Sequence, residues 1–284
     1  MKIINPFITG TFFPPSIPFL NILLANILLV FYKVLLLVKF PYAFGFSIVL
    51  LTLFIRFLFN PFFHKQLELN KKMQDLKPHL DKLNQKHKND QKTLQQEQLK
   101  LYQQAGINPA SGCLFTIIQM IVMVGLYNII FFLFNPNVNQ TIAEINKIIY
   151  FNFLKIGTLD PWFFGFNLGI APSQYQKFGL FYLLIPLITG VLQYWQFQVS
   201  MPVQPASKPN SEKGKDDKED FQKAMNVQMK FMFPALIGFF SYTMPVGLSL
   251  YWNIFSLFSI IQGRQLLKVD PHIQKNGGHP ERTK

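Results

Sequence analysis

The chain has 284 residues, of which 50% are hydrophobic and 14% are charged, yet its formal net charge is +13. A soluble domain averages about 25% charged residues. The composition therefore excludes an ordinary soluble protein and, together with the basic charge, indicates an integral membrane protein with lysine-rich segments on one side of the bilayer.

The first apolar run, residues 19–38, is predicted to form an interfacial amphipathic helix within an external N-terminal segment, 1–42. At about 100° per residue, its polar side chains fall within one arc of about 140°, and the rest of its surface is apolar. These polar side chains are Asn21, Asn26, Tyr32, Lys33 and Lys39. Such a helix can lie in the interface plane with its apolar face in the acyl chains. The alternative is an ordinary span.

Five further runs are long and apolar enough to cross a bilayer, which takes about 20 residues. They are residues 43–63, 112–134, 178–198, 228–244 and 247–267. Pro245 and Gly247 predict a tight turn between the last two runs, which would then form a hairpin. The predicted fold is an all-α integral membrane protein with five transmembrane helices.

The polar segment 64–111 is predicted to form an antiparallel helical hairpin. Apolar residues in its first half follow the spacing of a coiled-coil seam, and they are Leu69, Met73, Leu76, Leu80 and Leu83. The turn-forming stretch "KHKNDQK" (86–92) separates this helix from a second one that ends near Ala105. We expect Pro78 to kink the first helix.

The distribution of lysines predicts the orientation in the membrane. Segment 64–104 holds nine Lys, whereas the loop 135–177 holds three. Because positive charge favours the cytoplasmic side, the hairpin, the flexible loop 199–227 and the basic tail 268–284 are expected in the cytoplasm, and the loop 135–177 and the N-terminus outside. The simplest location is a bacterial plasma membrane.

Arg56 lies well inside the first span, where a charged arginine costs roughly 2.5–3.5 kcal/mol on insertion scales. The sequence shows no paired carboxylates in its spans, no Ser-His-Asp set, no zinc motif and no P-loop. The lone cysteine, Cys113, excludes a disulfide framework or a thiolate metal cluster. We therefore expect neither an enzyme nor a cofactor or metal.

The predicted spans also carry neutral polar side chains, which commonly form hydrogen bonds between helices. They are Ser47, Thr52, Asn60, Thr116, Gln119, Asn128, Thr189, Gln193, Gln196, Ser241, Thr243, Asn253, Ser256 and Gln262. Thr52 precedes Arg56 by four residues and shares its helix face. As a set around Arg56, these side chains predict a water-containing, positively charged recess that attracts the acidic or polar part of another polypeptide.

Four stretches of the sequence resemble the YidC-type membrane protein insertases, the family that includes the mitochondrial and chloroplast insertases. They are "GFSIVLLTLFIRFLFNPF" (45–62), "KMQDLKPHLDKLNQKHKND" (72–90), "LYQQAGINPASGCLFTIIQM" (101–120) and "MPVGLSLYWNIFSLFSIIQ" (244–262). The resemblance covers about residues 19–268. Many relatives carry Pro after the second-span "QM", where this chain has Ile121.

The resemblance implies five core spans around a hydrophilic groove that is open to the cytoplasm and to lipid, together with the hairpin and the interfacial helix. By motif, the groove arginine is Arg56, and Thr52, Gln119 and Tyr251 lie along the path of the substrate. Two further polar residues of the spans, Gln193 and Asn253, complete the expected groove.

The function that the resemblance implies is insertion and folding of membrane proteins, without a nucleotide. The alternative is a small-solute channel or transporter, although no charge ring or inverted repeat is visible. A third reading is an interaction scaffold built on the hairpin. The expected partners are nascent membrane proteins and the lipid bilayer. The ribosome, the signal recognition machinery and the Sec translocon are further candidates, and the chain is expected to act as a monomer.

Overall fold

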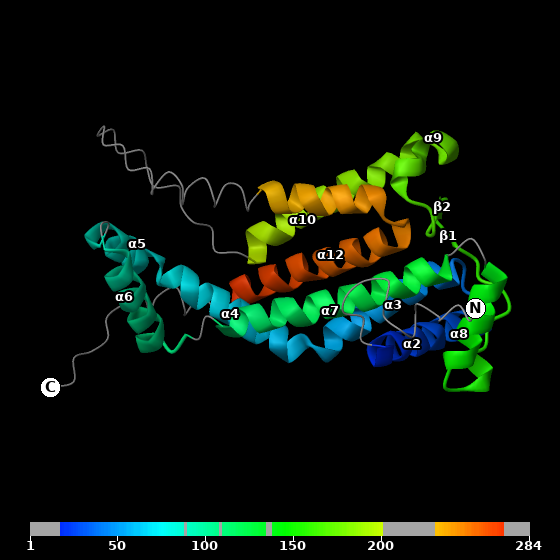
Figure 1. The fold of residues 1–284 in the computed structure, drawn as a ribbon, viewed down its shortest axis with the longest axis horizontal. Helices are drawn as coiled ribbons and strands as arrows, with labels where there is room; N and C mark the ends of the chain where they lie inside the picture. Colours follow the sequence, from blue (N-terminus) through cyan, green and yellow to red (C-terminus); the bar gives the residue numbers. More distant parts are fainter. Residues whose placement is uncertain (1–17, 88–89, 108–109, 135–137, 201–230, 270–284) are drawn as a thin grey trace, which may run out of the picture. The chain divides into compact units, whose positions relative to one another are not determined.

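The computed structural model describes residues 18–87, 90–107, 110–134, 138–200 and 231–269. These residues are mostly helical (Figure 1). The longer helices are α2 (Pro18–Leu37), α3 (Ala43–Leu58), α4 (Asn60–Asp75), α5 (Lys77–Lys86), α6 (Gln91–Gln104), α7 (Ala110–Leu133), α8 (Val138–Ile148), α10 (Leu184–Ser200), an unlabelled helix Phe231–Thr243 and α12 (Val246–Val269). Short elements connect α8 to α10: η1 (Asn152–Leu154), β1 (Trp162–Phe163), β2 (Phe166–Asn167), η2 (Pro172–Gln174), α9 (Tyr175–Phe178) and η3 (Leu180–Leu183). The predicted loop 199–227 and tail 268–284 lie almost wholly outside the described residues.

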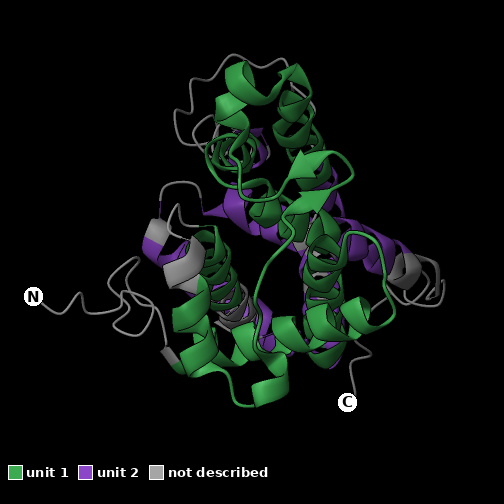
Figure 2. Cartoon of the chain, turned by 90° about the vertical axis from the view of Figure 1, so that its right-hand side faces the viewer, with its two compact units in different colours: residues 1–59, 116–193, 235–256 green, residues 60–115, 194–234, 257–284 purple. Residues whose placement is uncertain are grey.

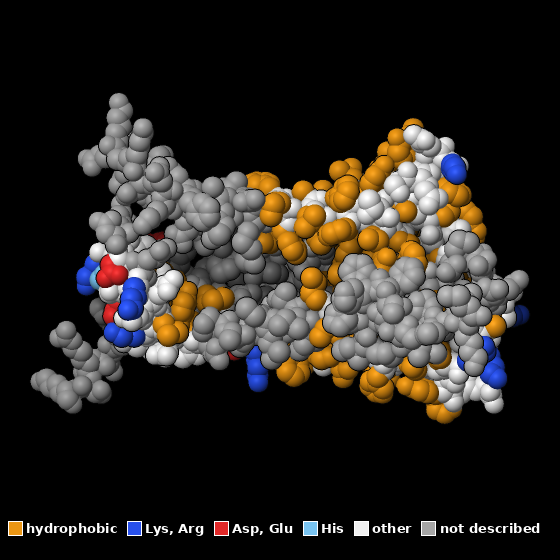
Figure 3. All heavy atoms as spheres, viewed as in Figure 1, with side chains coloured by type: hydrophobic (Ala, Val, Ile, Leu, Met, Phe, Trp, Pro, Cys, Tyr) orange, Lys and Arg blue, Asp and Glu red, His pale blue; other side chains and the backbone are white. Residues whose placement is uncertain are grey.

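Within the part of the chain that the structure describes, three helical segments are long and apolar enough to cross a membrane: Phe19–Leu37, Leu180–Val199 and Val246–Arg264. The pair α3 and α4 makes a fourth if it is taken as one span. Apolar side chains of α10 and of the helix Phe231–Thr243 lie on the surface (Figure 3). Because such exposure is unfavourable in water, the helices are those of a multi-pass membrane protein.

The chain divides into two compact units (Figure 2). Unit 1 consists of residues 1–59, 116–193 and 235–256, and unit 2 of residues 60–115, 194–234 and 257–284. Unit 1 holds Arg56 and the other five predicted groove residues, and unit 2 holds the predicted hairpin.

In unit 1, α2 packs along α3. The connection is short because Lys39 and Tyr42 adopt left-handed backbone conformations, with φ of 53° and 55°. The ring of Tyr32 meets that of Phe44 edge-on, with the centroids 5.9 Å apart. The two helices thus bury a shared apolar seam that places α3, and with it Arg56.

Three of the five polar side chains predicted to face the membrane interface are instead covered by protein, whereas Lys33 is half-buried and Lys39 is exposed. Asn21, Asn26 and Tyr32 are only 1%, 5% and 3% exposed. Asn26 donates to the carbonyl of Ile148 and accepts from the amide of Tyr150. Polar side chains in membrane helices gain hydrogen bonds by facing other protein segments. The placement of α2 in the interface stays a prediction, and the helix also meets the length and composition of a span.

The first predicted span, 43–63, is not one continuous helix, since α3 stops at Leu58 and α4 begins at Asn60, and it stays a prediction as a span because the two helices qualify only together. Pro61 lacks the N–H that a continuous helix would need at that position. Proline is, however, favoured in the first turn of a new helix. The chain therefore ends one helix and starts another.

A small β-hairpin closes onto the first turns of α3. Its strands pair antiparallel, with Trp162 opposite Asn167 and Phe163 opposite Phe166. The two turn residues between the strands have φ of 46° and 85°, as two-residue hairpin turns require. The ring of Phe163 lies so close to Gly45 that a Cβ there would be 2.0 Å from it. Only glycine fits at this position without movement of the ring.

The segment after β2 also accepts hydrogen bonds from the first backbone amides of α12. The amides of Val246 and Gly247 donate to the carbonyls of Ile170 and Leu168, at 3.0 and 2.8 Å. The first N–H groups of a helix have no partner within that helix. The connecting segment therefore fixes the position of α12 from its N-terminal end.

In unit 2, α5 and α6 form an antiparallel pair. Asn84 of α5 accepts a hydrogen bond from Gln98 of α6 at 3.0 Å. Asp90 caps α6 by accepting from the amide of Thr93 at 3.1 Å. The helix is interrupted at Leu76, and the next helix, α5, has Pro78 in its first turn. The proline expected to kink one helix thus separates α4 from α5.

Candidate functional site

Arg56 occupies the last turn of α3 and is the one charged side chain among the buried residues that the structure describes. Its side chain is 1% exposed. Removing a cation from water is costly unless it gains compensating contacts. The contacts of the guanidinium therefore decide what this site can do.

The described contacts of Arg56 include two with Phe255 of α12. Its Nη2 donates to the main-chain oxygen of Phe255 at 2.9 Å. Its Cζ lies 3.6 Å from the centroid of the Phe255 ring. A desolvated cation–π contact is worth about 2 kcal/mol, and a hydrogen bond to a charged group about 1.5–3 kcal/mol. Together these contacts offset much of the cost of burial.

This geometry differs from the hydrated recess that the sequence predicts around Arg56. With 1% exposure, the guanidinium is shielded from solvent in this conformation. The charge is held against the aromatic face and the backbone of α12. The site therefore holds a buried positive charge that Phe255 of α12 contacts with both its ring and its carbonyl.

Buried hydroxyl and amide groups join three helices of unit 1 next to this contact. Gln193 of α10 donates to Ser256 of α12 at 2.7 Å. Ser241, on the helix Phe231–Thr243, hydrogen-bonds Thr189 of α10 at 3.1 Å and Ser249 of α12 at 2.8 Å. Such bonds between membrane helices average about 0.6 kcal/mol each. They hold α12 in register with its neighbours at the turn that carries Phe255.

The residues predicted for the groove have different roles in the structure. Thr52 is buried on the face of α3 that carries Arg56, but its hydroxyl donates within the helix to the carbonyl of Ile48 at 2.7 Å. Gln193 is buried and bonded as described above. Gln119 belongs to α7, but its side chain lies outside the described residues.

Two predicted residues lie on α12 near Phe255. Tyr251 is fully buried, its ring centroid is 6.0 Å from that of Phe255, and it interacts electrostatically with Arg56. Asn253 is half-buried, and its side-chain oxygen accepts no hydrogen bond within the described part of the chain. The structure thus places Tyr251 near the arginine, while the side-chain oxygen of Asn253 has the capacity to accept a hydrogen bond.

Sequence reasoning missed Phe255, which contacts Arg56 with both its ring and its main-chain oxygen. One signal was available, because Phe255 follows Tyr251 by four residues and therefore shares its helix face. Ser249 was missed as well, because a lone serine in an apolar run is not distinctive. Neither residue type predicts a partner across helices without the fold.

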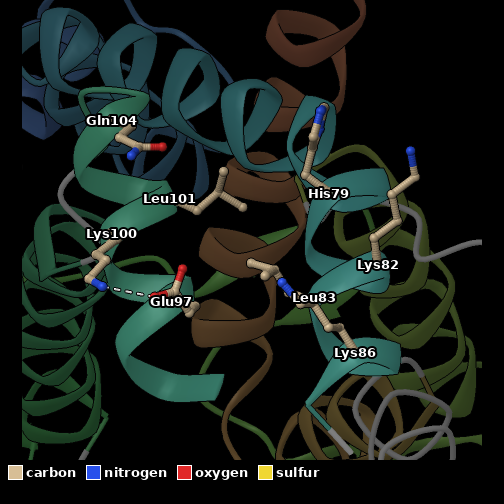
Figure 4. A pocket seen from close by; sticks show the side chains of 8 residues that line it. All are labelled: His79, Lys82, Leu83, Lys86, Glu97, Lys100, Leu101 and Gln104. Atoms are coloured by element: carbon tan, nitrogen blue, oxygen red, sulfur yellow. Dashed lines mark hydrogen bonds and ion pairs between the residues drawn. The ribbon is translucent and has the colours of Figure 1, made fainter. Parts of the chain in front are cut away.

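A second candidate site lies between α5 and α6 (Figure 4). Leu83 and Leu101 line it, and it is ringed by Lys82, Lys86, Lys100, His79, Glu97 and Gln104. Glu97 pairs with Lys100 at 2.8 Å, which lowers the pKa of the Glu97 carboxyl. The hairpin therefore presents an apolar patch with a basic rim.

The described residues contain no group of three or more His, Cys, Asp or Glu side chains able to hold a metal ion.

Comparison with known proteins gives consistent matches along most of the chain. A family model described as "60Kd inner membrane protein" matches residues 36–271. The chain is 32% identical over 243 residues to the membrane protein insertase MisCA of Bacillus subtilis, which covers 83% of this chain and 76% of that protein. It is 28% identical over 226 residues to the membrane protein insertase YidC of Oceanobacillus iheyensis, at 77% and 72% coverage. The chain belongs to the YidC-type insertase family.

Members of this insertase family from chloroplasts are similar as well. Inner membrane protein ALBINO3 of Arabidopsis thaliana is 30% identical over 243 residues, covering 83% of this chain and 50% of that protein. The chain thus spans about half the length of this relative. A solved structure titled "Active YidC insertase crystal structure with the first transmembrane domain resolved" is 25% identical, with a TM-score of 0.49, covering 87% of this chain and 46% of that chain. The family assignment rests on the sequence matches.

Proposed function

We propose that this chain is a membrane protein insertase that recruits the hydrophilic part of a nascent membrane protein with the charge of Arg56. The observation that carries the proposal is a permanent cation kept within an apolar helical unit, beside interhelical hydroxyl and amide groups. Family membership supports the same activity. An arginine that served only packing would be an expensive choice at this depth.

The chemistry of recruitment is electrostatic. A charge in surroundings of low dielectric constant acts over a longer range than one at a water-exposed surface. Arg56 attracts acidic or polar groups of the incoming segment and lowers the cost of moving them into the membrane. The apolar span that follows then leaves the groove for lipid. No nucleotide or cofactor takes part in these steps.

The proposed groove is lined by Arg56, Thr52 and Tyr251, together with Gln193, Asn253 and Gln119. Gln193 and Asn253 offer amide groups to the polar backbone of a substrate. Gln119 is included by its position in the family motif alone. In this proposal the groove opens toward the cytoplasm and lipid between five spans, and α2 lies at the outer interface.

The proposed orientation follows from the lysine distribution. The segment with α5 and α6 faces the cytoplasm of a bacterial cell, as does the C-terminus, and the N-terminus lies outside the plasma membrane. The basic rim of the hairpin site fits an acidic partner. The ribosome, the signal recognition machinery and the Sec translocon are the proposed partners at this face, and the insertase acts as a monomer.

Insertion into proteoliposomes tests the function. The substrate is a single-span protein with an acidic N-terminal tail, compared with a version whose tail carboxylates are changed to amides. We expect Arg56→Ala to reduce insertion of the acidic substrate at least about fivefold, since opposite charges about 4 Å apart attract by about 1 kcal/mol even in water. Arg56→Lys keeps part of the activity.

The matched control is Arg264→Ala, which removes an exposed arginine in the C-terminal part of α12. This variant should insert both substrates normally. Normal insertion of the acidic substrate by Arg56→Ala would overturn the recruitment proposal. Insertion that is absent in the wild-type protein would overturn the insertase function itself.

A further inference from the structure

The guanidinium that recruitment requires is covered in this structure, and two of its contacts come from one residue of α12. Nη2 of Arg56 bonds the main-chain oxygen of Phe255, and the guanidinium stacks on the ring of the same residue, 3.6 Å from its centroid. We infer that Phe255 is a positioning residue that keeps Arg56 docked at rest, and that carboxylates of an arriving substrate segment release it. This inference rests on the proposed function.

The docking partner is held firmly from two sides. Tyr251, one turn earlier, is fully buried and packs its ring against that of Phe255. Ser256, the next residue along α12, accepts the hydrogen bond from Gln193. Both the ring and the carbonyl that meet Arg56 are therefore held by neighbours, so we expect the contact to open by movement of the arginine side chain and not of α12.

A carboxylate can replace what the docked arginine gives up. It accepts two parallel hydrogen bonds from a guanidinium, and such charge-assisted pairs are stronger than bonds to a neutral group. A neutral hydroxyl or amide offers a bond no better than the one that the carbonyl of Phe255 already accepts. Neutral segments therefore leave Arg56 docked on Phe255, whereas acidic segments shift it to the released state.

The docked state predicts slow chemical modification of Arg56. The chain has three arginines, Arg56, Arg264 and Arg282, and phenylglyoxal modifies guanidinium groups that reagent can reach. In purified wild-type protein in liposomes, mass spectrometry should show Arg56 labelled at least about tenfold more slowly than the exposed Arg264. Equal labelling rates of these two residues in the wild type would overturn the inference, whatever the variants do.

Variants at Phe255 separate the ring from general packing. Phe255→Leu should raise the labelling rate of Arg56 about three- to thirtyfold, the range that a cation–π contact supports. Phe255→Tyr keeps the ring and should keep the protection. The matched control is Phe54→Leu, the same change at an exposed ring of α3 that packs on Phe31, and it should leave labelling unchanged. Equal labelling in Phe255→Leu and the wild type would refute docking by the ring.

Insertion rates supply a readout that a merely structural role would not give. An acidic substrate must compete with Phe255 for the guanidinium of Arg56. Phe255→Leu weakens this competition, so it should raise the insertion rate of the acidic substrate several-fold at low substrate concentration. The insertion rate of the neutral substrate should not change. In the Arg56→Ala background Phe255→Leu should have no effect. A loss for both substrates contradicts the inference. If Arg56→Ala inserts normally while labelling follows the predictions, docking stands and the recruitment proposal fails.

Discussion

Replacing Gly45 with alanine is predicted to destabilise unit 1, because the new methyl group would strike the β1–β2 hairpin. A Cβ at Gly45 would lie 2.0 Å from Cδ2 of Phe163 and 2.5 Å from Cγ, whereas carbon atoms in contact lie about 3.5–4.0 Å apart. The ring has little room to turn, since Tyr42 and Phe46 pack edge-on against it with centroids 6.1 and 5.3 Å away. Overpacking typically costs about 1–3 kcal/mol, more than the about 0.5–1 kcal/mol that alanine gains over glycine within a helix.

Gly190 of α10 provides the matched control, since a Cβ there would meet nothing within 4 Å. Thermal unfolding of the purified protein in detergent should show a lower Tm for Gly45→Ala than for the wild type, and an equal or higher Tm for Gly190→Ala. Adding Phe163→Leu to Gly45→Ala should recover part of the loss, because the shorter side chain relieves the clash. If Gly45→Ala and Gly190→Ala prove equally stable, the packing argument is refuted.

Two further predictions concern single hydrogen bonds. The bond from Gln193 to Ser256 should contribute about 0.6 kcal/mol, and up to about 1.7 kcal/mol; a double-mutant cycle of Gln193→Leu and Ser256→Ala in chemical unfolding measures it, and zero coupling would contradict the bond. Hydrogen bonds from Thr93 lower the pKa of the Asp90 carboxyl below its usual value of 3.8. The charged carboxylate therefore stabilises α6 fully at pH values above 3.8. This stabilisation is lost as the pH falls through the lower pKa of the folded state. Hydrogen exchange at the Thr93 amide should therefore accelerate in acid in the wild type but stay independent of pH, beyond intrinsic exchange, in Asp90→Asn.

The helices of this chain could be predicted from its apolar runs, because a run of that length must satisfy its own backbone in lipid. The residues at which these helices end were harder to predict. Hydropathy alone carries the first span to residue 63, although Asn60-Pro61 marks the place where α3 gives way to α4. Proline acts through the backbone hydrogen bond that it cannot donate, which a sum of side-chain hydrophobicity does not contain.

The polar face of α2 shows a second reason why sequence falls short. Periodicity places Asn21 and Asn26 on one side of a helix but does not say whether lipid headgroups or protein cover that side. In the structure Asn26 bonds the carbonyl of Ile148 at the end of α8 and the amide of Tyr150 just after it, so protein supplies its partners. The same ambiguity applies to every amphipathic helix in a membrane protein, since protein and headgroups both offer hydrogen-bond partners.

Arg56 could be singled out from the sequence, because a permanent charge in an apolar run has no packing rationale. Its partner could not, because Phe255 lies 199 residues away along the chain and is one of 32 phenylalanines. Ring contacts depend on the rotation of α12 about its axis. That rotation is set by the hydroxyl network of Ser249 and Ser256, which no local pattern reports.

Burial of Arg56 affects both how strongly and how selectively its charge can attract a substrate. A guanidinium open to water would interact with any anion at the cytoplasmic surface, and its attraction would be weakened by the high dielectric constant. A guanidinium docked on an aromatic ring and a carbonyl keeps its charge in surroundings of low dielectric constant. In the proposed mechanism, the contacts that make Arg56 tolerable in the resting bundle are therefore the same contacts that an acidic segment must outcompete, so stability at rest and selectivity for substrate come from one pair of residues.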